Sequence, residues 1–145
     1  MQQPSSNRVV EIVLPNVLGY ERIAMACSES FGKLHGLRPD RIEDLKTIVA
    51  EASTNAMQHG NGGRAEARVV IRLERLAKGI KVSVTDEGNG FDAPVKDPDI
   101  ERIINDLEDP VGFGVFLIRN LADEVAYTRN PAGGHQVEMR ISLSA

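Results

Sequence analysis

The chain contains a single cysteine, Cys27, and no tryptophan. A lone cysteine excludes an intrachain disulfide and a cysteine cage for a metal, because each needs at least two thiols. Cys27 is therefore interpreted as a small residue on a helix. Aromatic residues make up only 4% of the sequence, so the core must be mainly aliphatic. An aliphatic core fits helices packed against a sheet.

A basic surface and a long apolar segment are also missing. The net charge is -4 and the 17 Lys and Arg residues are scattered, which disfavours direct binding to nucleic acid. No apolar run approaches the roughly 20 residues that cross a bilayer, and the N-terminus lacks the charged and apolar regions of a signal peptide. We therefore expect a cytoplasmic protein with no membrane segment.

With 145 residues, the chain has the size of one compact domain. Residues 1–7 are polar and are expected to be flexible, so the domain is expected over residues 8–145. Residues 91–111 contain three prolines and many acids, and so long a connection is typical of a lid over a functional site. The spacing of apolar residues between Ile100 and Leu107 predicts a short helix within that lid.

Hydrophobic periodicity predicts five strands and three long helices. The strands are predicted at residues 8–14, 67–73, 80–85, 124–128 and 136–143, and the helices at about 17–35, 39–60 and 115–122. The strands alternate apolar and polar residues, which is typical of a sheet with one packed and one wetted face. This pattern favours an antiparallel sheet over a doubly wound fold.

The helix predicted at residues 39–60 carries a polar pair. Glu51 and Asn55 are four residues apart, so they lie one turn above the other, beside the apolar stripe. Asn55 offers a neutral oxygen to a magnesium ion, and Glu51 could accept a proton in phosphoryl transfer. Taken alone, the pair is a weak signal, because two solvated polar residues near a helix end are far more common.

Two glycine-rich segments follow in the sequence. Asp86 ends an alternating strand, so its carboxylate at the sheet rim could accept a hydrogen bond from an exocyclic amine, and Gly88 and Gly90 would let a flat ring approach the backbone. Gly112 and Gly114 precede a predicted helix, whose free N–H groups favour phosphate oxygens. Each segment alone also fits ordinary turn chemistry, and the second is neither a Walker A loop nor a dinucleotide fingerprint. The three features together, in this order, are much less expected by chance.

The three segments read Glu51-Ala52-x-x-Asn55-Ala56-x-x-His59-Gly60, Asp86-x-Gly88-x-Gly90-Phe91 and Gly112-x-Gly114-Val115-x-Leu117-Ile118. They resemble the N, G1 and G2 boxes of the Bergerat-fold (GHKL) ATPases, and most of all the anti-sigma-factor serine kinases of the RsbW type. The resemblance covers roughly residues 8–143. It implies an α/β two-layer sandwich, in which a largely antiparallel mixed sheet carries helices on one face and ATP lies between the helices and the lid.

The resemblance also implies a role for each matching position. Glu51 would be the catalytic base, Asn55 the magnesium ligand and Asp86 the adenine contact. The other nucleotide-binding residues would be Gly88 and Gly90 beside the adenine, and Gly112, Phe113, Gly114 and Val115 along the triphosphate. Two segments depart from the family pattern. Gly134–Val137 lacks the small polar residue common on the last strand, and Pro110-Val111 stands where a polar or basic residue is frequent.

The implied activity is that of an ATP- and Mg²⁺-dependent serine/threonine kinase. Its implied partners are an anti-anti-sigma protein of the STAS type, which it phosphorylates, and a sigma factor, which it sequesters; a homodimer is implied as well. The alternative is a nucleotide-gated binding module with little or no transfer, but such a module needs no base at Glu51. A detached histidine kinase ATPase domain is disfavoured because no helix with a phosphoacceptor histidine precedes residue 8. A relative that serves another partner switch is a further alternative.

Overall fold

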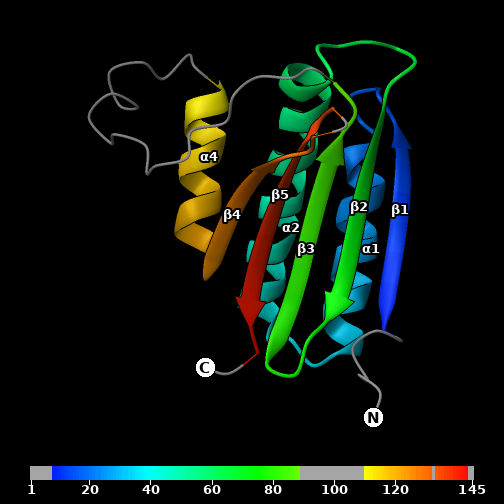
Figure 1. The fold of residues 1–145 in the computed structure, drawn as a ribbon. Helices are drawn as coiled ribbons and strands as arrows, with labels where there is room; N and C mark the ends of the chain where they lie inside the picture. The colour runs from blue at the N-terminus through cyan, green and yellow to red at the C-terminus, as the bar shows by residue number, and fades with distance from the viewer. Residues whose placement is uncertain (1–7, 89–109, 132, 144–145) are drawn as a thin grey trace.

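The computed structural model describes residues 8–88, 110–131 and 133–143. Five strands form one sheet in the order β1-β2-β3-β5-β4 (Figure 1). Their bounds are β1 Val9–Pro15, β2 Arg68–Arg75, β3 Gly79–Asp86, β4 Glu124–Arg129 and β5 His135–Ser142. Within the described ranges every neighbouring pair is antiparallel. The prediction of a largely antiparallel sheet is confirmed.

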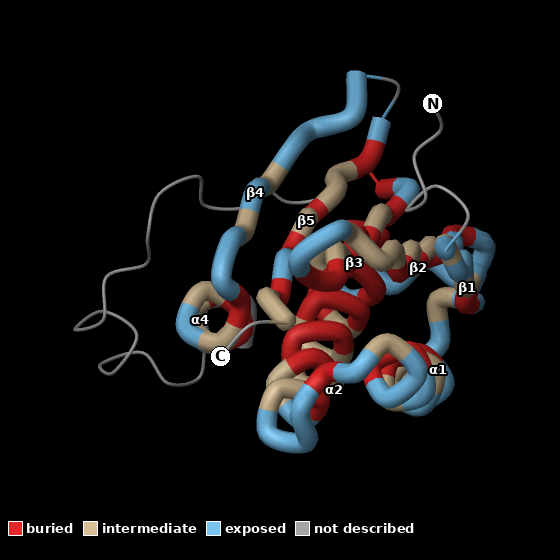
Figure 2. Tube along the Cα trace, turned by 90° about the horizontal axis from the view of Figure 1, so that it is seen from below, coloured by how far each residue is buried: buried red, intermediate tan, exposed pale blue. Residues whose placement is uncertain are grey.

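The helices all cover one face of the sheet, so the molecule is a two-layer sandwich (Figures 1 and 2). They are α1 Glu21–Leu34, α2 Pro39–Asn55 and α4 Pro110–Leu121, and α2 continues into a π-helical turn, η2 Ala56–Gly60. Figure 2 shows α2 as the most buried helix, between α1 and α4. The predicted layer arrangement is therefore confirmed, and α2, the predicted carrier of the polar pair, is its central helix.

The core lies between α2 and the inner face of the sheet. The helix contributes apolar side chains at the predicted spacing, and β2 and β3 contribute alternate residues: Ile42, Leu45, Ile48 and Val49 from α2, Val69, Ile71 and Leu73 from β2, and Ile80, Val82 and Val84 from β3. Burying each such side chain stabilises the fold by about 1.5–3 kcal/mol. The outer face instead carries cross-strand ion pairs, such as Arg72 with Glu11 and Lys81 with Glu74. One face is packed and the other wetted, as the alternation predicted.

Two helix starts differ from the sequence prediction. The first helix, predicted from about Val17, begins at Glu21, because the preceding turn places Gly19 at φ 108° and the Gly19 N–H donates to the Glu21 carboxylate at 2.7 Å. The third helix, predicted from Val115, begins at Pro110. Proline is favoured in the first helical turn because an N–H group there has no intrahelical acceptor, so the lack of one in proline costs no hydrogen bond. The segment Gly112–Gly114 is consequently helical rather than a loop before the helix.

Some predictions fall on residues that the structure does not describe. Residues 1–7, residues 91–109 of the expected lid with their short helix, and Gly90 lie outside the described ranges. For residues 8–88, 110–131 and 133–143, the structure contains no helix with the length and apolar character of a membrane span.

Candidate active site

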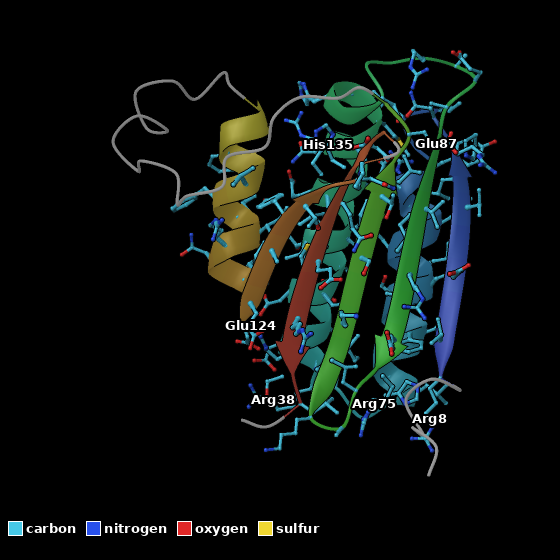
Figure 3. All side chains as sticks on the ribbon, viewed as in Figure 1. Arg8, Arg38, Arg75, Glu87, Glu124 and His135 are labelled. Atoms are coloured by element: carbon cyan, nitrogen blue, oxygen red, sulfur yellow. The ribbon has the colours of Figure 1, made fainter. Side chains whose placement is uncertain are left out.

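A cavity of about 300 Å³ lies between α2, α4 and one end of strands β3, β4 and β5. Its lining includes two residues singled out from the sequence for their polar side chains, Asn55 and Asp86, and Val115, a predicted nucleotide-binding residue of the third motif. The remaining lining residues are Ala52, Ala56, Val84, Ile118, Tyr127, Thr128, Arg129, His135, Gln136 and Val137. In Figure 3, His135 and Glu87 mark this end of the sheet, opposite the end with Arg75 and Arg8. One cavity thus joins all three motifs.

Asp86 is the most constrained of the predicted polar residues. It is the last residue of β3 and only 5% exposed, so it lies deeper than the sheet rim expected from the sequence. Its Oδ1 accepts hydrogen bonds from the N–H groups of Gly88 and His135, each at 3.1 Å. The His135 Nδ1 lies 3.7 Å from the same oxygen. The two backbone N–H donors offset the cost of burying the Asp86 carboxylate and fix its orientation.

Glycines form the walls around Asp86. A methyl group added at Gly60 would collide with the Asp86 carboxylate, and one added at Gly88 would collide with the Gly60 carbonyl. Gly134 has φ 92°, and a methyl group there would collide with the Asp86 carbonyl. Only residues without a Cβ fit such close approaches. Gly88 therefore packs against the Gly60 backbone, next to Asp86, whereas Gly90 is outside the described residues.

Asn55 is the last α-helical residue of α2 and is 9% exposed. The backbone beyond it changes to the π-helical turn η2, a local widening that recurs at functional sites. The change moves Gly60 away from the position a continuous α-helix would give it, and Gly60 then meets Asp86 as described above. Asn55 lines the cavity, so the predicted magnesium ligand is placed where a ligand in the cavity could reach it.

Glu51 lies one turn before Asn55 and is partly buried, beside the cavity lining rather than within it. Burial raises the pKa of the Glu51 carboxyl above its ordinary value. Gly114 of α4 packs against both residues, because a methyl group added there would lie 2.9 Å from Glu51 Oε1 and 3.0 Å from Asn55 Nδ2. The structure therefore brings the third motif onto the first.

The remaining residues of the third motif take different positions along α4. Val115 is buried against the cavity, whereas Phe113 is 41% exposed. Gly112 falls in the first helical turn, where N–H groups have no intrahelical partner. Gly114 is the fifth helical residue, so its N–H belongs to the regular i to i−4 pattern. Gly112 thus lies in the first turn, as the phosphate-binding interpretation requires, whereas Gly114 lies beyond it.

Sequence reasoning missed the cavity residues from β4 and β5. Tyr127 and Arg129 come from β4, and nothing in the local pattern distinguished them from ordinary strand residues. His135 lies within Gly134–Val137, the segment that departs from the family pattern, but no role was predicted for its side chain. Burial raises the pKa of the Tyr127 hydroxyl, and the nearby Arg119, whose Cζ lies 5.7 Å from the Tyr127 ring centroid, opposes that shift. Tyr127, Arg129 and His135 thus line the same cavity as Asp86.

Comparison with known protein families identifies residues 15–141 as a histidine kinase-like ATPase domain. This match spans most of the chain, including every site residue discussed above. It agrees with the arrangement of three motifs around one cavity.

Individual relatives are similar over most of their length. The chain is 30% identical over 126 residues to the serine-protein kinase RsbW of Bacillus velezensis, covering 83% of this chain and 78% of that protein. It is 30% identical over 138 residues to the anti-sigma F factor of Bacillus cereus, covering 89% of this chain and 94% of that protein. Among solved structures, the RsbU and RsbW domains of Rv1364c from Mycobacterium tuberculosis match with a TM-score of 0.68 at 19% identity, over 94% of this chain and 33% of that one. The structural match supports the fold.

Proposed function

The chain belongs to the histidine kinase-like ATPase family and, within it, to the serine-protein kinases of the RsbW type, and we propose that it phosphorylates a small anti-anti-sigma partner of the STAS type. One observation carries the assignment of its site. Gly114 of α4 packs against both Glu51 and Asn55, at the side of a cavity lined by Asp86. This packing supports the proposal that a base, a metal ligand and an adenine contact share one site.

The proposed nucleotide pose begins at Asp86. Its Oδ1 is occupied by two backbone N–H groups, and the carboxylate lines the cavity, where it can accept a hydrogen bond from the exocyclic amine of adenine. Guanine carries a carbonyl oxygen at that position, which would face the carboxylate with no proton between them. The pose therefore predicts adenine selectivity.

Magnesium and the phosphates would lie toward the other end of the site. Asn55 would supply one neutral oxygen to Mg²⁺, which commonly takes its other ligands from phosphate and water. The Gly112 N–H in the first turn of α4 would face the phosphate chain, where the helix dipole favours negative charge. A bound magnesium ion would neutralise part of the charge on the phosphates. The Asn55 side chain and the Gly112 N–H would fix the positions of the ion and of the phosphate chain.

Glu51 would act as the general base. In the proposed step the partner's serine or threonine oxygen bonds to the γ-phosphorus, the bond from that phosphorus to the β–γ bridging oxygen breaks, and ADP leaves. The hydroxyl proton passes to the Glu51 carboxylate. Burial raises the Glu51 pKa above its ordinary value, which makes the carboxylate a stronger proton acceptor.

The partners are proposed from the relatives. A relative named anti-sigma F factor supports sequestration of a sigma factor as a second, alternative interaction. We propose the cytoplasm as the site of action, because ATP and sigma factors are found there, and a homodimer as the working assembly. The lid role of residues 91–111 and the single domain over residues 8–145 are part of the same proposal.

The first test is calorimetric titration of the purified chain with ATP, ADP and GTP, with and without Mg²⁺. Adenine-selective, magnesium-dependent binding is expected. The second test incubates the chain with MgATP and STAS-domain proteins of the same organism, and measures the gain of one phosphate on an intact partner by mass spectrometry. A stable nucleotide-dependent complex without phosphorylation would instead support the binding module.

A further inference from the structure

A buried asparagine lies directly after the π-helical turn η2. Asn61 is 1% exposed, and its carboxamide makes three hydrogen bonds. The Nδ2 group donates to Asn16 Oδ1 at 3.1 Å and to the Arg68 carbonyl at 3.0 Å. The Oδ1 atom accepts from the Glu87 N–H at 2.7 Å. One side chain therefore joins the segment after β1, the start of β2 and the residue after Asp86.

The backbone of Asn61 is bonded as thoroughly as its side chain. Its N–H donates to the Ala56 carbonyl at 2.7 Å, at the start of η2. Its carbonyl accepts from the Arg64 N–H and from Arg64 Nε, both at 3.2 Å. Both carboxamide N–H donors and the carboxamide oxygen have partners, so burial of this polar group is fully compensated.

These bonds connect the two halves of the proposed site. Ala56 follows Asn55, the proposed magnesium ligand, and Glu87 follows Asp86, the proposed adenine contact. Asn61 bonds to Ala56 through its backbone and to Glu87 through its side chain. We propose that Asn61 is a positioning residue that sets the separation of Asn55 and Asp86, and so controls nucleotide affinity rather than the transfer step. This inference rests on the proposed function.

A second connection to Glu87 is present but exposed. The Glu87 carboxylate accepts from the Arg68 N–H at 2.9 Å, from Nε at 3.0 Å and from Nη2 at 2.7 Å. The Arg64 guanidinium also reaches the Glu87 carbonyl at 3.1 Å. Solvent-exposed ion pairs of this kind stabilise a structure only weakly. The Asn61 bond is partly buried and therefore better shielded from water than the Arg68 bonds, and losing it leaves the Glu87 N–H without its side-chain acceptor.

The test compares Asn61→Ala with Asn16→Ala. Both variants break the same buried network, but only Asn61→Ala removes the bond to Glu87. For Asn61→Ala we expect the Kd for MgATP to rise about tenfold, the effect of losing one partly buried hydrogen bond, with kcat at saturating ATP within about twofold of wild type. Asn16→Ala should keep its ATP affinity within about twofold of wild type, at temperatures where both variants are folded.

Amide hydrogen exchange of the wild-type chain gives a test that needs no variant. The Glu87 N–H should be strongly protected in the nucleotide-free protein and should gain further protection with ADP, together with the amides of η2. Fast exchange at Glu87 would overturn the inference. Equal ATP affinity for Asn61→Ala and Asn16→Ala would also overturn it. So would a loss of ATP affinity that is proportional to the loss of folding stability in both variants. If the wild-type chain binds no nucleotide, the proposed function itself is wrong and the inference falls with it.

Discussion

The two carboxylates of the site, Asp86 and Glu51, lie in contrasting surroundings. Asp86 ends a strand, is 5% exposed, receives two backbone N–H bonds and is enclosed by glycines. Glu51 lies mid-helix, is partly buried, and receives no hydrogen bond on its carboxylate from the residues that the structure describes. The same functional group is thus held rigidly at one end of the site and left available at the other.

This difference matches the two tasks proposed for the carboxylates. A carboxylate that recognises a ligand must keep one orientation, and backbone donors supply it. A carboxylate that accepts a proton benefits from partial desolvation, because burial disfavours its charged form and raises its pKa. Environment rather than residue type would therefore separate the proposed binding role of Asp86 from the proposed proton transfer to Glu51.

Removing the base should have the largest effect. Glu51→Gln keeps the shape of the side chain but cannot accept a proton, so phosphate transfer should fall by about 10²- to 10⁴-fold. The Kd for MgATP should stay within about twofold of wild type, because the loss concerns the transition state. Transfer is measured as phosphate on the partner protein. Glu43→Gln on the exposed side of the same helix is the matched control, and a parallel loss of ATP binding would show that Glu51 is structural.

Neutralising the binding carboxylate should have the next largest effect. Asp86→Asn retains an oxygen but replaces a charged acceptor, so the Kd for ATP and ADP should rise by roughly 10- to 100-fold. Any weak GTP binding should change little, because guanine has a carbonyl oxygen instead of an amine at the position proposed to face Asp86. Calorimetry on both nucleotides measures the contrast, with Asp40→Asn as an exposed control. Equal weakening for adenine and guanine nucleotides would contradict the adenine contact.

Adding one methyl group at Gly114 tests the packing of α4 on α2. In Gly114→Ala the Cβ would press on the Glu51 and Asn55 side chains, at a cost of about 1–3 kcal/mol. Alanine in place of glycine favours the helix by about 1 kcal/mol. The two effects partly offset in stability, so the melting temperature should shift little while kcat falls about fivefold. An unchanged kcat would mean that α4 does not need this close approach.

The pH dependence of stability should show the smallest effect. The Glu51 pKa is raised in the folded chain, so the folded state holds the proton more tightly than the unfolded state. Ionisation then lowers stability as the pH rises from the unfolded pKa through the folded pKa. Glu51→Gln removes this penalty and should be slightly more stable than wild type at pH 7, but not at pH 4. The effect is small because water screens a partly exposed group, and thermal unfolding at both pH values measures it.

Much of the architecture could be predicted because it follows from local periodicity. The alternation Val69, Ile71, Leu73 predicted β2, and the apolar stripe of α2 predicted the central helix. Element ends were less predictable. The start of α1 depends on a hydrogen bond from Gly19 to Glu21, and the start of α4 at Pro110 placed Gly112 and Gly114 inside a helix. Such ends depend on competing local bonds that hydrophobic periodicity does not report.

The sequence by itself determined the elements, the placement of Glu51 and Asn55 on one helix face, and the family, since these depend on spacing within a few residues. Only the tertiary structure decided which distant residues meet. Gly114 reaches Glu51 across two helices, His135 donates to Asp86 across 49 residues, and Asn61 accepts from Glu87 across 26. These contacts follow from strand pairing and core packing, which no local pattern specifies because they depend on the whole chain folding at once.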